Sequence, residues 1–268
     1  MTTPLPLPPL EMRWLVGPTD DSDYDNPTGE LVFPTLAPAA YEAVLDWGCG
    51  CGRVARRLIQ QSPRPKHYVG LDLHRGMIRW CQDNLAPRAP GFEFRHHDVF
   101  EADFNPDSTT GWLPFPADAD SFTLAIAWSV FTHVNEEQAV RYLDEMARVL
   151  RPGGVLASSW FLFDKREFPM MQPFQNALFI NDANPTNAVI FDREWLVRTA
   201  RNAGLVPVRV EPPTMRGYQW MIYLQPLAEG VVEVSLPEDT APYGSWVAPP
   251  PAANRHRVGL ELDDPAET

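Results

Sequence analysis

The stretch VLDWGCGCGRVARRLI, residues 44–59, decides the fold of this chain. A short apolar run leads to an aspartate, Asp46, and three alternate glycines follow it, Gly48, Gly50 and Gly52. Glycines at such positions let the backbone turn tightly and approach a ligand, and the helix that follows points free N–H groups at the same place. The stretch therefore predicts a strand, a ligand-binding turn and a helix.

Short apolar runs alternate with helix-period segments along the rest of the chain. They recur about every 25 to 30 residues, which is the spacing of βα units that build a parallel sheet. Their near-continuous hydrophobicity agrees, because both faces of a parallel sheet are covered. A closing pair of strands follows them. The predicted strands are 43–47, 67–73, 92–99, 122–129 and 154–161, then 206–211 and 220–225.

Two of the intervening helices carry start and stop signals. Asn135 followed by Gln138 is typical of a capping box, and the sequence RPGG at 151–154 ends that helix. Asp192 is expected to cap the second helix, and Gly204 to end it. The residues expected to face the core are Val140, Leu143, Ala147 and Leu150 in the first helix and Leu196, Ala200 and Ala203 in the second.

The composition separates four segments. Residues 1–36 are expected to form an N-terminal arm that covers the binding site, and residues 37–227 the main domain. Within it, residues 161–191 break the pattern and are too long for an ordinary connection. This insertion is either a lid or substrate cap over the site or an irregular packing layer. Residues 228–268 are predicted to be a proline-rich tail.

Charge and cysteine content restrict the function. The 268 residues are 44% hydrophobic and carry a net charge of −13, which disfavours nucleic acid as a partner. No apolar run is long enough to cross a membrane, and the first residues do not read as a secretory signal. Three cysteines cannot all pair, so we expect a protein of the reducing cytoplasm.

Three aspartates follow predicted strands. Asp46 precedes the first glycine, Asp72 closes the second strand 20 residues after Gly52, and Asp98 follows the third strand. Ligands of parallel sheets bind at the carboxyl ends of the strands, so the three carboxylates are expected to converge on one crevice. The spacing of Asp72 is that of a carboxylate that binds a ribose diol.

The charge of these acids distinguishes two kinds of ligand. Two unit charges 4 Å apart interact by about 4 kcal/mol at an effective dielectric constant near 20. Asp46 therefore opposes the pyrophosphate of a dinucleotide and attracts a ligand that carries a sulfonium and an ammonium group. The acids favour the cationic ligand.

Four motifs in order resemble the motif series of class I S-adenosylmethionine-dependent methyltransferases. The resemblance covers residues 40–225, and the phrase SVFTHV at 129–134 is similar to one in bacterial small-molecule methyltransferases. It implies a doubly wound α/β fold, a Rossmann-like, mostly parallel sheet of seven strands with the last antiparallel, and S-adenosylmethionine as the cofactor. The four motifs are Asp46-x-Gly48-x-Gly50-x-Gly52, Gly70-Leu71-Asp72, His97-Asp98-Val99 and VLRPGG at 149–154.

The resemblance also implies which residues hold the methionyl part of the cofactor. Asp46, Gly48 and Gly50 of the glycine loop lie along it. Ser129, at the end of the fourth strand, approaches the ammonium group, and Arg53 meets the carboxylate.

A second group of residues is implied for the nucleoside part. Asp72 accepts hydrogen bonds from the ribose hydroxyls. Leu73 and Met77 contact the faces of the adenine ring. Asp98, with the backbone of Val99, contacts the adenine amino edge.

His133 is the candidate general base. It follows the fourth strand just beyond the implied cofactor contacts, and imidazole titrates near neutral pH. The alternative is a histidine that packs at the start of the next helix and bonds to the backbone. No spacing of acids supports a metal site, so we expect metal-independent chemistry.

The reaction expected from the sequence is methyl transfer to a small molecule, at a hydroxyl oxygen. Alternatives are transfer to nitrogen or carbon, a nicotinamide-linked oxidoreductase on the same type of sheet, and a binding module without catalysis. Asp46 and the missing Gly-x-x-Gly ending of a dinucleotide loop disfavour the oxidoreductase.

The side chains that either line an apolar acceptor pocket or fill the core are Phe161, Phe163, Met170, Met171 and Phe174. The oligomeric state stays open.

Overall fold

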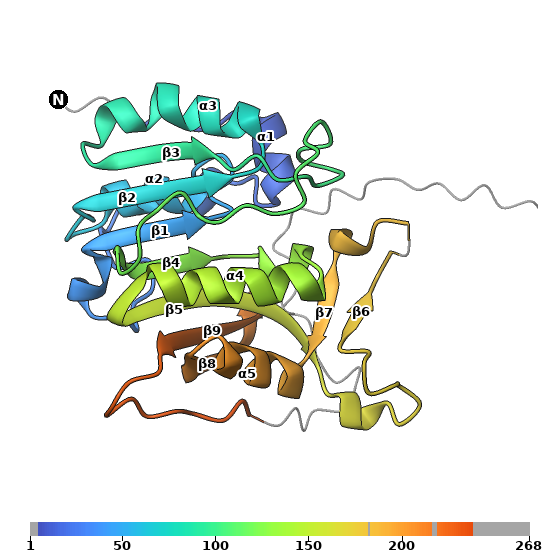
Figure 1. Ribbon diagram of the computed structural model, residues 1–268. Helices are drawn as coiled ribbons and strands as arrows, with labels where there is room; N and C mark the ends of the chain where they lie inside the picture. Colours follow the sequence, from blue (N-terminus) through green and yellow to red (C-terminus); the bar gives the residue numbers. More distant parts are fainter. Residues whose placement is uncertain (1–4, 182, 216–218, 238–268) are drawn as a thin grey trace, which may run out of the picture. The chain divides into compact units, whose positions relative to one another are not determined.

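Five parallel strands form the centre of the sheet, as the spacing of the apolar runs predicts (Figure 1). They lie side by side in the order β3-β2-β1-β4-β5. The computed structural model describes residues 5–181, 183–215 and 219–237 of the chain. The five strands are β1 (Ala43–Trp47), β2 (His67–Asp72), β3 (Phe92–His96), β4 (Phe122–Ala127) and β5 (Leu150–Phe163).

Two further strands complete the sheet beyond β5. The last strand, β9 (Gln219–Pro226), lies between β5 and β8 (Leu205–Met215) and runs antiparallel to both. Leu156 of β5 lies opposite Leu224 of β9. This arrangement confirms the predicted doubly wound, mostly parallel sheet with an antiparallel last strand, and these seven strands belong to a sheet of nine.

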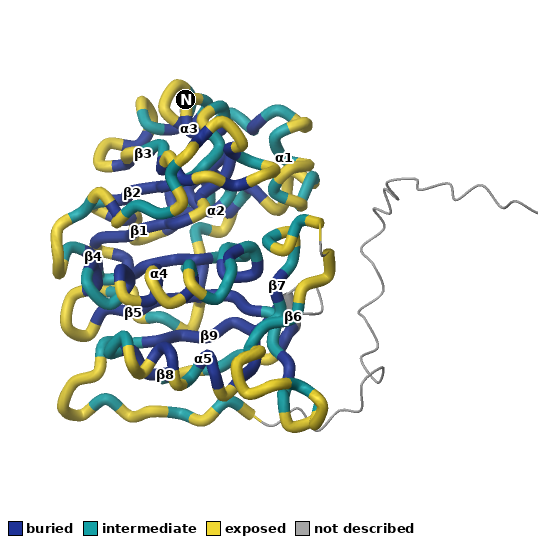
Figure 2. The backbone as a smooth tube through the Cα atoms, turned by 45° about the vertical axis from the view of Figure 1, so that its right-hand side comes forward, coloured by how far each residue is buried: buried dark blue, intermediate teal, exposed yellow. Residues whose placement is uncertain are grey.

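Two hydrophobic cores cover the two faces of the sheet. One contains the inward side chains of α2 (Arg53–Gln60) and α3 (Arg75–Asn84), together with residues of the arm such as Phe33. The other contains those of α4 (Glu136–Val149) and α5 (Arg193–Asn202). The strands between them are buried along most of their length (Figure 2).

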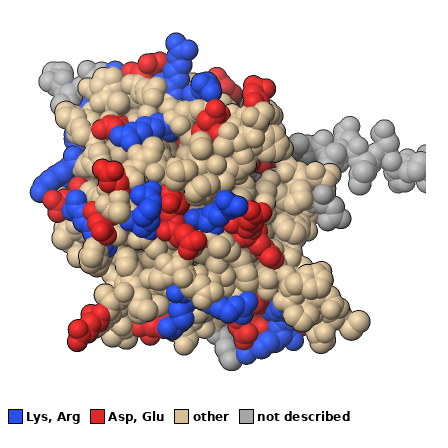
Figure 3. All heavy atoms as spheres, viewed as in Figure 1, with Lys and Arg blue, Asp and Glu red and all other residues tan. Residues whose placement is uncertain are grey.

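Charged side chains lie on the outside of these layers. On the face shown in Figure 3, lysines and arginines are interspersed with aspartates and glutamates and form no continuous basic surface. Such exposed pairs, for example Arg141 with Glu137 at 2.7 Å, contribute little to stability. None of the helices in the described part of the chain has the length and apolar character that crossing a bilayer requires.

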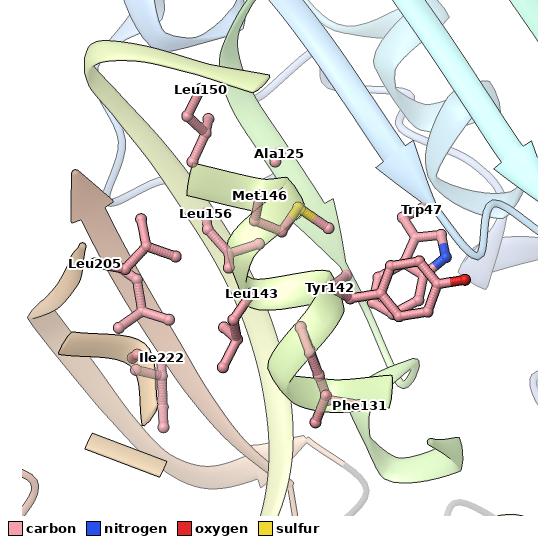
Figure 4. Packing of buried hydrophobic residues seen from close by; sticks show 14 of the residues in the cluster. Trp47, Ala125, Phe131, Tyr142, Leu143, Met146, Leu150, Leu156, Leu205 and Ile222 are labelled. Atoms are coloured by element: carbon pink, nitrogen blue, oxygen red, sulfur yellow. The ribbon is translucent and has the colours of Figure 1, made fainter. Parts of the chain in front are cut away.

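Helix α4 begins as the sequence predicts. The Asn135 side chain accepts the N–H of Gln138 at 2.9 Å, and the Gln138 side chain accepts the N–H of Asn135 at 3.0 Å. The prediction that Val140 faces the core is wrong, because this side chain is 40% exposed. Leu143 is buried on the sheet as predicted, with Tyr142 and Met146 beside it (Figure 4). Ala139 and Val149 complete this buried face, and Leu150, also expected in the helix, is buried as the first residue of β5.

No helix connects β3 to β4. Residues 97–121, all of them described, form an irregular connection instead. Its Phe115 is buried against Tyr142, with 5.4 Å between ring centroids, and against Trp47, with 5.6 Å. This aromatic side chain fills the space over the sheet that a helix would otherwise cover.

The insertion at 161–191 folds as a hairpin on an extension of β5. β7 (Val189–Asp192) pairs in parallel with residues 161–163, and β6 (Ala177–Phe179) pairs antiparallel with β7. β5 is longer than the predicted strand at both ends, because Leu150 pairs with Phe122 of β4 and residues 161–163 pair with β7. Phe163 is buried, whereas Met170 and Phe174 are 88% and 75% exposed.

The arm contributes a short helix, and the described end of the chain runs beside the sheet. α1 (Leu10–Val16) has no buried residue of its own. The N–H of Val234 donates to the carbonyl of Pro207 in β8 at 2.8 Å, so residues 228–237 lie along the sheet edge. The remainder of the predicted tail, 238–268, lies outside the described residues.

Candidate functional site

The glycine loop has the backbone that only glycine adopts readily. Gly48, Gly50 and Gly52 have φ angles of 78°, 53° and 82°. A Cβ atom on Gly50 would lie 2.7 Å from a methyl group of Val16 in the arm, and one on Gly48 would lie 2.3 Å from a methyl group of Val130. The loop therefore depends on glycine for its conformation and for the close approach of its neighbours.

A cavity of about 320 Å³ opens above this loop. Its walls come from α1, the glycine loop, the carboxyl ends of β1 and β2, the connection after β3 and the start of α4. This is the edge of the sheet at which the sequence predicts a ligand. The predicted site residues that line it are Asp46, Gly48, Gly50, Arg53, Asp72, Leu73, Met77, Val99, Ser129 and His133.

Asp46 is buried at the floor of the cavity. Its side chain is 1% exposed and accepts a hydrogen bond from the Tyr68 hydroxyl at 2.7 Å. Burial raises the pKa of Asp46 to about 7, and the carboxyl of Asp72 adds to the rise, while Tyr68 and Arg53 oppose it. A bound cation stabilises the ionised form of such a group.

Asp72 is held by backbone N–H groups. One carboxylate oxygen accepts the N–H of Gly50 at 2.7 Å and the other accepts the N–H of His74 at 2.8 Å. Burial raises its pKa, and these two hydrogen bonds oppose the rise. The carboxylate therefore has a fixed orientation beside the glycine loop.

Arg53 and Ser129, which the resemblance assigns to the methionyl part of the cofactor, both line the cavity. The Arg53 guanidinium stacks over the Trp128 ring, 4.7 Å from the centroid. Ser129 has a φ angle of 60°, which is unusual for a residue with a side chain. Its N–H donates to the Ser159 hydroxyl at 2.7 Å and its own hydroxyl donates to the side-chain oxygen of buried Gln219 at 2.9 Å. These bonds support the strained conformation.

The third predicted carboxylate does not join the other two. Asp98 is exposed and is absent from the cavity lining, although its neighbour Val99 lines it. The Asn105 side chain donates to Asp98 at 3.0 Å, which holds the carboxylate against its own connection. The expected convergence therefore holds for Asp46 and Asp72 but is wrong for Asp98.

His133 lies in η4 (Phe131–His133), at the wall of the cavity. Its Nδ1 is 3.1 Å from the carbonyl oxygen of Thr186, which can only accept, so Nδ1 carries the proton. Thr186 belongs to the insertion, and its hydroxyl donates to the carboxylate of Glu101 at 3.0 Å. The insertion thus bonds to both sides of the cavity.

The side chains that were candidates for an apolar acceptor pocket do not line this cavity. They are Phe161, Phe163, Met170, Met171 and Phe174.

Several lining residues were not predicted from the sequence. Tyr142 belongs to the buried face of α4, yet it also reaches the cavity, and its hydroxyl lies 3.1 Å from Nε2 of buried His97. Burial lowers the pKa of His97 to about 4, so this imidazole is neutral. Phe100 and Glu101 lie four and five residues beyond the end of β3, in the same connection as Asp98, and this position was the available signal.

Neither metal binding nor thiol chemistry is supported by the described residues. They contain no group of three or more His, Cys, Asp or Glu side chains placed to hold a metal ion. Cys49, Cys51 and Cys81 are buried, and burial raises the pKa of each thiol. Thiols of this kind are poor nucleophiles at neutral pH.

The sheet order, the glycine loop and its two carboxylates define the class I S-adenosylmethionine-dependent methyltransferases. Residues 44–154 match the family model described as a methyltransferase domain. This part of the chain is therefore similar to a methyltransferase domain, and S-adenosylmethionine is the cofactor of the class.

Curated relatives match about half of the chain. A phthiotriol/phenolphthiotriol dimycocerosates methyltransferase of Mycobacterium ulcerans is 29% identical over 150 residues, covering 56% of this chain and 48% of the relative. A fatty-acid O-methyltransferase of Mycolicibacterium smegmatis is 36% identical over 129 residues, covering 47% and 40%. The chain thus spans less than half the length of these relatives.

The fold is shared with solved methyltransferases. A structure of an S-adenosylmethionine-dependent methyltransferase from Leishmania major superposes with a TM-score of 0.53, at 15% identity, over 81% of this chain and 78% of that one. The predictions of fold, enzyme class and cofactor are confirmed at the level of this domain. The roles of individual site residues stay predictions.

Proposed function

We propose that this protein transfers the methyl group of S-adenosylmethionine to a hydroxyl oxygen of a small-molecule acceptor. The observation that carries the proposal is the cavity over the glycine loop, which Asp46, Asp72 and Arg53 line on one side and His133 on another. Two carboxylates and one guanidinium match the charged groups of this cofactor in kind.

The residues present fit the cofactor. The acids suit an ammonium, a sulfonium and a ribose diol, and Gly48 and Gly50 of the glycine loop line the same cavity. When bound, S-adenosylmethionine supplies an electrophilic methyl group on a sulfonium. Asp46 would hold the ammonium and Asp72 the ribose hydroxyls. Arg53, oriented by Trp128, would hold the carboxylate.

His133 is proposed as the base that takes the proton of the acceptor hydroxyl. Because Nδ1–H donates to the Thr186 carbonyl, Nε2 carries the lone pair. A base fixed in this tautomer raises the nucleophilicity of a hydroxyl held near it, while the cavity walls position the acceptor for in-line attack.

The relatives support a small-molecule acceptor. Their printed names specify a fatty acid and a complex lipid, and another, from Halobacterium salinarum, is an arsenite methyltransferase. The net charge of −13 supports the same proposal, since a polyanion such as nucleic acid would be repelled. Transfer to nitrogen remains the second candidate, because His133 serves an amine acceptor as well. The cytoplasmic location expected from the sequence stays a prediction.

Titration calorimetry tests the cofactor part of the proposal. S-adenosylhomocysteine should bind and NAD should not. Asp72→Asn should weaken S-adenosylhomocysteine binding by about 10- to 100-fold, because the ribose hydroxyls lose a charged acceptor worth about 1.5–3 kcal/mol. Asp83→Asn, which changes an exposed acid of α3 outside the cavity lining, is the matched control. Heat with NAD alone would contradict the proposal.

Transfer of a tritiated methyl group from the labelled cofactor to acceptors in a small-molecule extract tests the catalytic part. Labelled product is expected in the extract, and mass spectrometry of that product identifies the methylated atom. Binding of S-adenosylhomocysteine without any labelled product would leave a non-catalytic binding module.

A further inference from the structure

Three large apolar side chains both line the cavity and face solvent. Trp14 is 58% exposed, Leu15 50% and Phe100 46%. We name these three residues the cavity rim. They come from two separate elements, α1 and the connection after β3, which line the same cavity. Large apolar side chains that gather at a cavity mouth mark a ligand contact more often than scattered ones do.

Packing of the protein itself does not account for the rim. Helix α1 has no buried residue, and the arm is anchored by other groups. Val16 packs over Gly50, and the Arg13 guanidinium donates to the Thr19 carbonyl at 2.6 Å and to Asp21 at 2.7 Å. Trp14 and Leu15 are therefore available to a ligand without any loss of core packing.

The cavity also contains a fixed carboxylate, that of Glu101, which has no part in the proposed cofactor contacts. One oxygen of Glu101 accepts the N–H groups of Asp103 at 2.8 Å and Phe104 at 2.9 Å, and the other accepts the Thr186 hydroxyl. Among the described residues that line the cavity, Arg53 is the one Lys or Arg, and its proposed partner is the cofactor. An acceptor with its own carboxylate would therefore lie near the carboxylate of Glu101. Among the described lining residues, no further lysine or arginine would remain to pair with it.

From these observations we infer that the acceptor is an amphiphile with an uncharged or cationic head. Its apolar chain contacts the cavity rim, and its hydroxyl or amine head lies toward His133 and Glu101. Long-chain alcohols and amines fit this description, and free fatty acids do not. The inference rests on the proposed function, because the head is the group that is methylated.

Binding to the protein saturated with S-adenosylhomocysteine tests the inference without turnover. Calorimetric titrations with butan-1-ol, hexan-1-ol and octan-1-ol should show a dissociation constant that falls by about fourfold for each added methylene group. Octylamine should bind at least as tightly as octan-1-ol. Octanoate, which has a chain of the same length, should bind at least tenfold more weakly.

Variants of the rim identify where the chain binds. Phe100→Ser and Trp14→Ser should reduce the gain in affinity per methylene group to about twofold or less. Phe174→Ser is the matched control, since Phe174 is 75% exposed and lies outside the cavity lining. It should leave the chain-length dependence as in the parent protein.

Three results would overturn the inference. They are an affinity independent of chain length, octanoate binding as tight as that of octan-1-ol, and rim variants that weaken S-adenosylhomocysteine binding while leaving the chain-length dependence intact.

Failure of the proposed function gives a different pattern. Chain-dependent binding with no methyl transfer to octan-1-ol contradicts the proposed function alone, whereas transfer to short polar acceptors without chain dependence contradicts the inference alone.

Discussion

Asp46 is a carboxyl group whose ionisation is sensitive near neutral pH because it is buried. The raised pKa of about 7 means that the free protein holds a proton there in mildly acidic solution. The cofactor's ammonium group binds the ionised form, so binding releases that proton below pH 7. Affinity should therefore increase with pH and reach a plateau above the pKa.

We expect the affinity for S-adenosylhomocysteine to rise by up to about tenfold between pH 6 and pH 8. Calorimetry at several pH values, in buffers of different ionisation enthalpy, measures both the affinity and the proton release. Asp46→Asn should bind weakly at every pH and show a flat profile. A parent profile that falls with pH would refute the ionic role of Asp46.

His133 should affect turnover more than binding. His133→Ala is expected to lower kcat by about 10²-fold when the acceptor is a hydroxyl, because its proton has no base. The affinity for S-adenosylhomocysteine should stay within a few-fold of the parent. His67→Ala, at the start of β2 and outside the cavity lining, is the control. Unchanged turnover at saturating acceptor would remove His133 from the mechanism.

Sequence reasoning places individual residues well where a strand end fixes them. Asp72 is the last residue of β2, and Asp46 is the last residue but one of β1. Because β1 and β2 are parallel neighbours, their carboxyl ends bring both side chains to the same edge of the sheet. Asp98 lies two residues beyond the end of β3, in a connection whose path the strand does not determine. Tyr142 was missed because the same side chain serves the core and the cavity.

At the scale of elements, α4 is the helix whose start the sequence predicts most clearly. Its capping box satisfies two N–H groups at the helix start, and Gln138 of that box also lines the cavity. The stability of α4 therefore affects the position of the wall that contains Tyr142.

Asn135→Ala should lower the free energy of unfolding by about 1 kcal/mol, since the N–H of Gln138 loses its acceptor. Urea denaturation followed by circular dichroism measures the change. Asn135→Ser should restore most of the lost stability because serine also caps. An alanine variant as stable as the parent would show that the helix start is held by tertiary contacts instead.

The β6–β7 hairpin and the extension of β5 that carries it could not be predicted from the sequence. The hairpin β6–β7 has short strands, of which β6 is partly exposed and β7 is mostly buried, so neither shows a clear alternation along the sequence. The strand extension that carries it was likewise hidden, because pairing with β7, a tertiary contact, determines where β5 ends. The predicted lid or cap role of the insertion stays a prediction, although Thr186 bonds to groups on both sides of the cavity.

At the scale of the whole molecule, the cavity connects parts of the chain that are far apart in sequence. Its lining joins the arm, the glycine loop, the connection after β3 and the start of α4, and these pack on both cores. A ligand that contacts all four should stabilise the folded state as a unit.

A ligand that binds the folded state alone stabilises it by about 2.7 kcal/mol at a concentration 100 times its dissociation constant. For S-adenosylhomocysteine this corresponds to a rise in Tm of about 5–10 °C. Scanning calorimetry should show the rise as one shifted transition. NAD at the same concentration should give no shift, and an equal shift with NAD would contradict the assigned cofactor.

The contact between Val16 and Gly50 has a practical consequence for engineering. Because a valine methyl occupies the space that a side chain at position 50 would need, the two positions form a matched pair. Attempts to define a minimal catalytic fragment should begin upstream of α1, and a transplant of the glycine loop into another scaffold should bring an equivalent of Val16 with it.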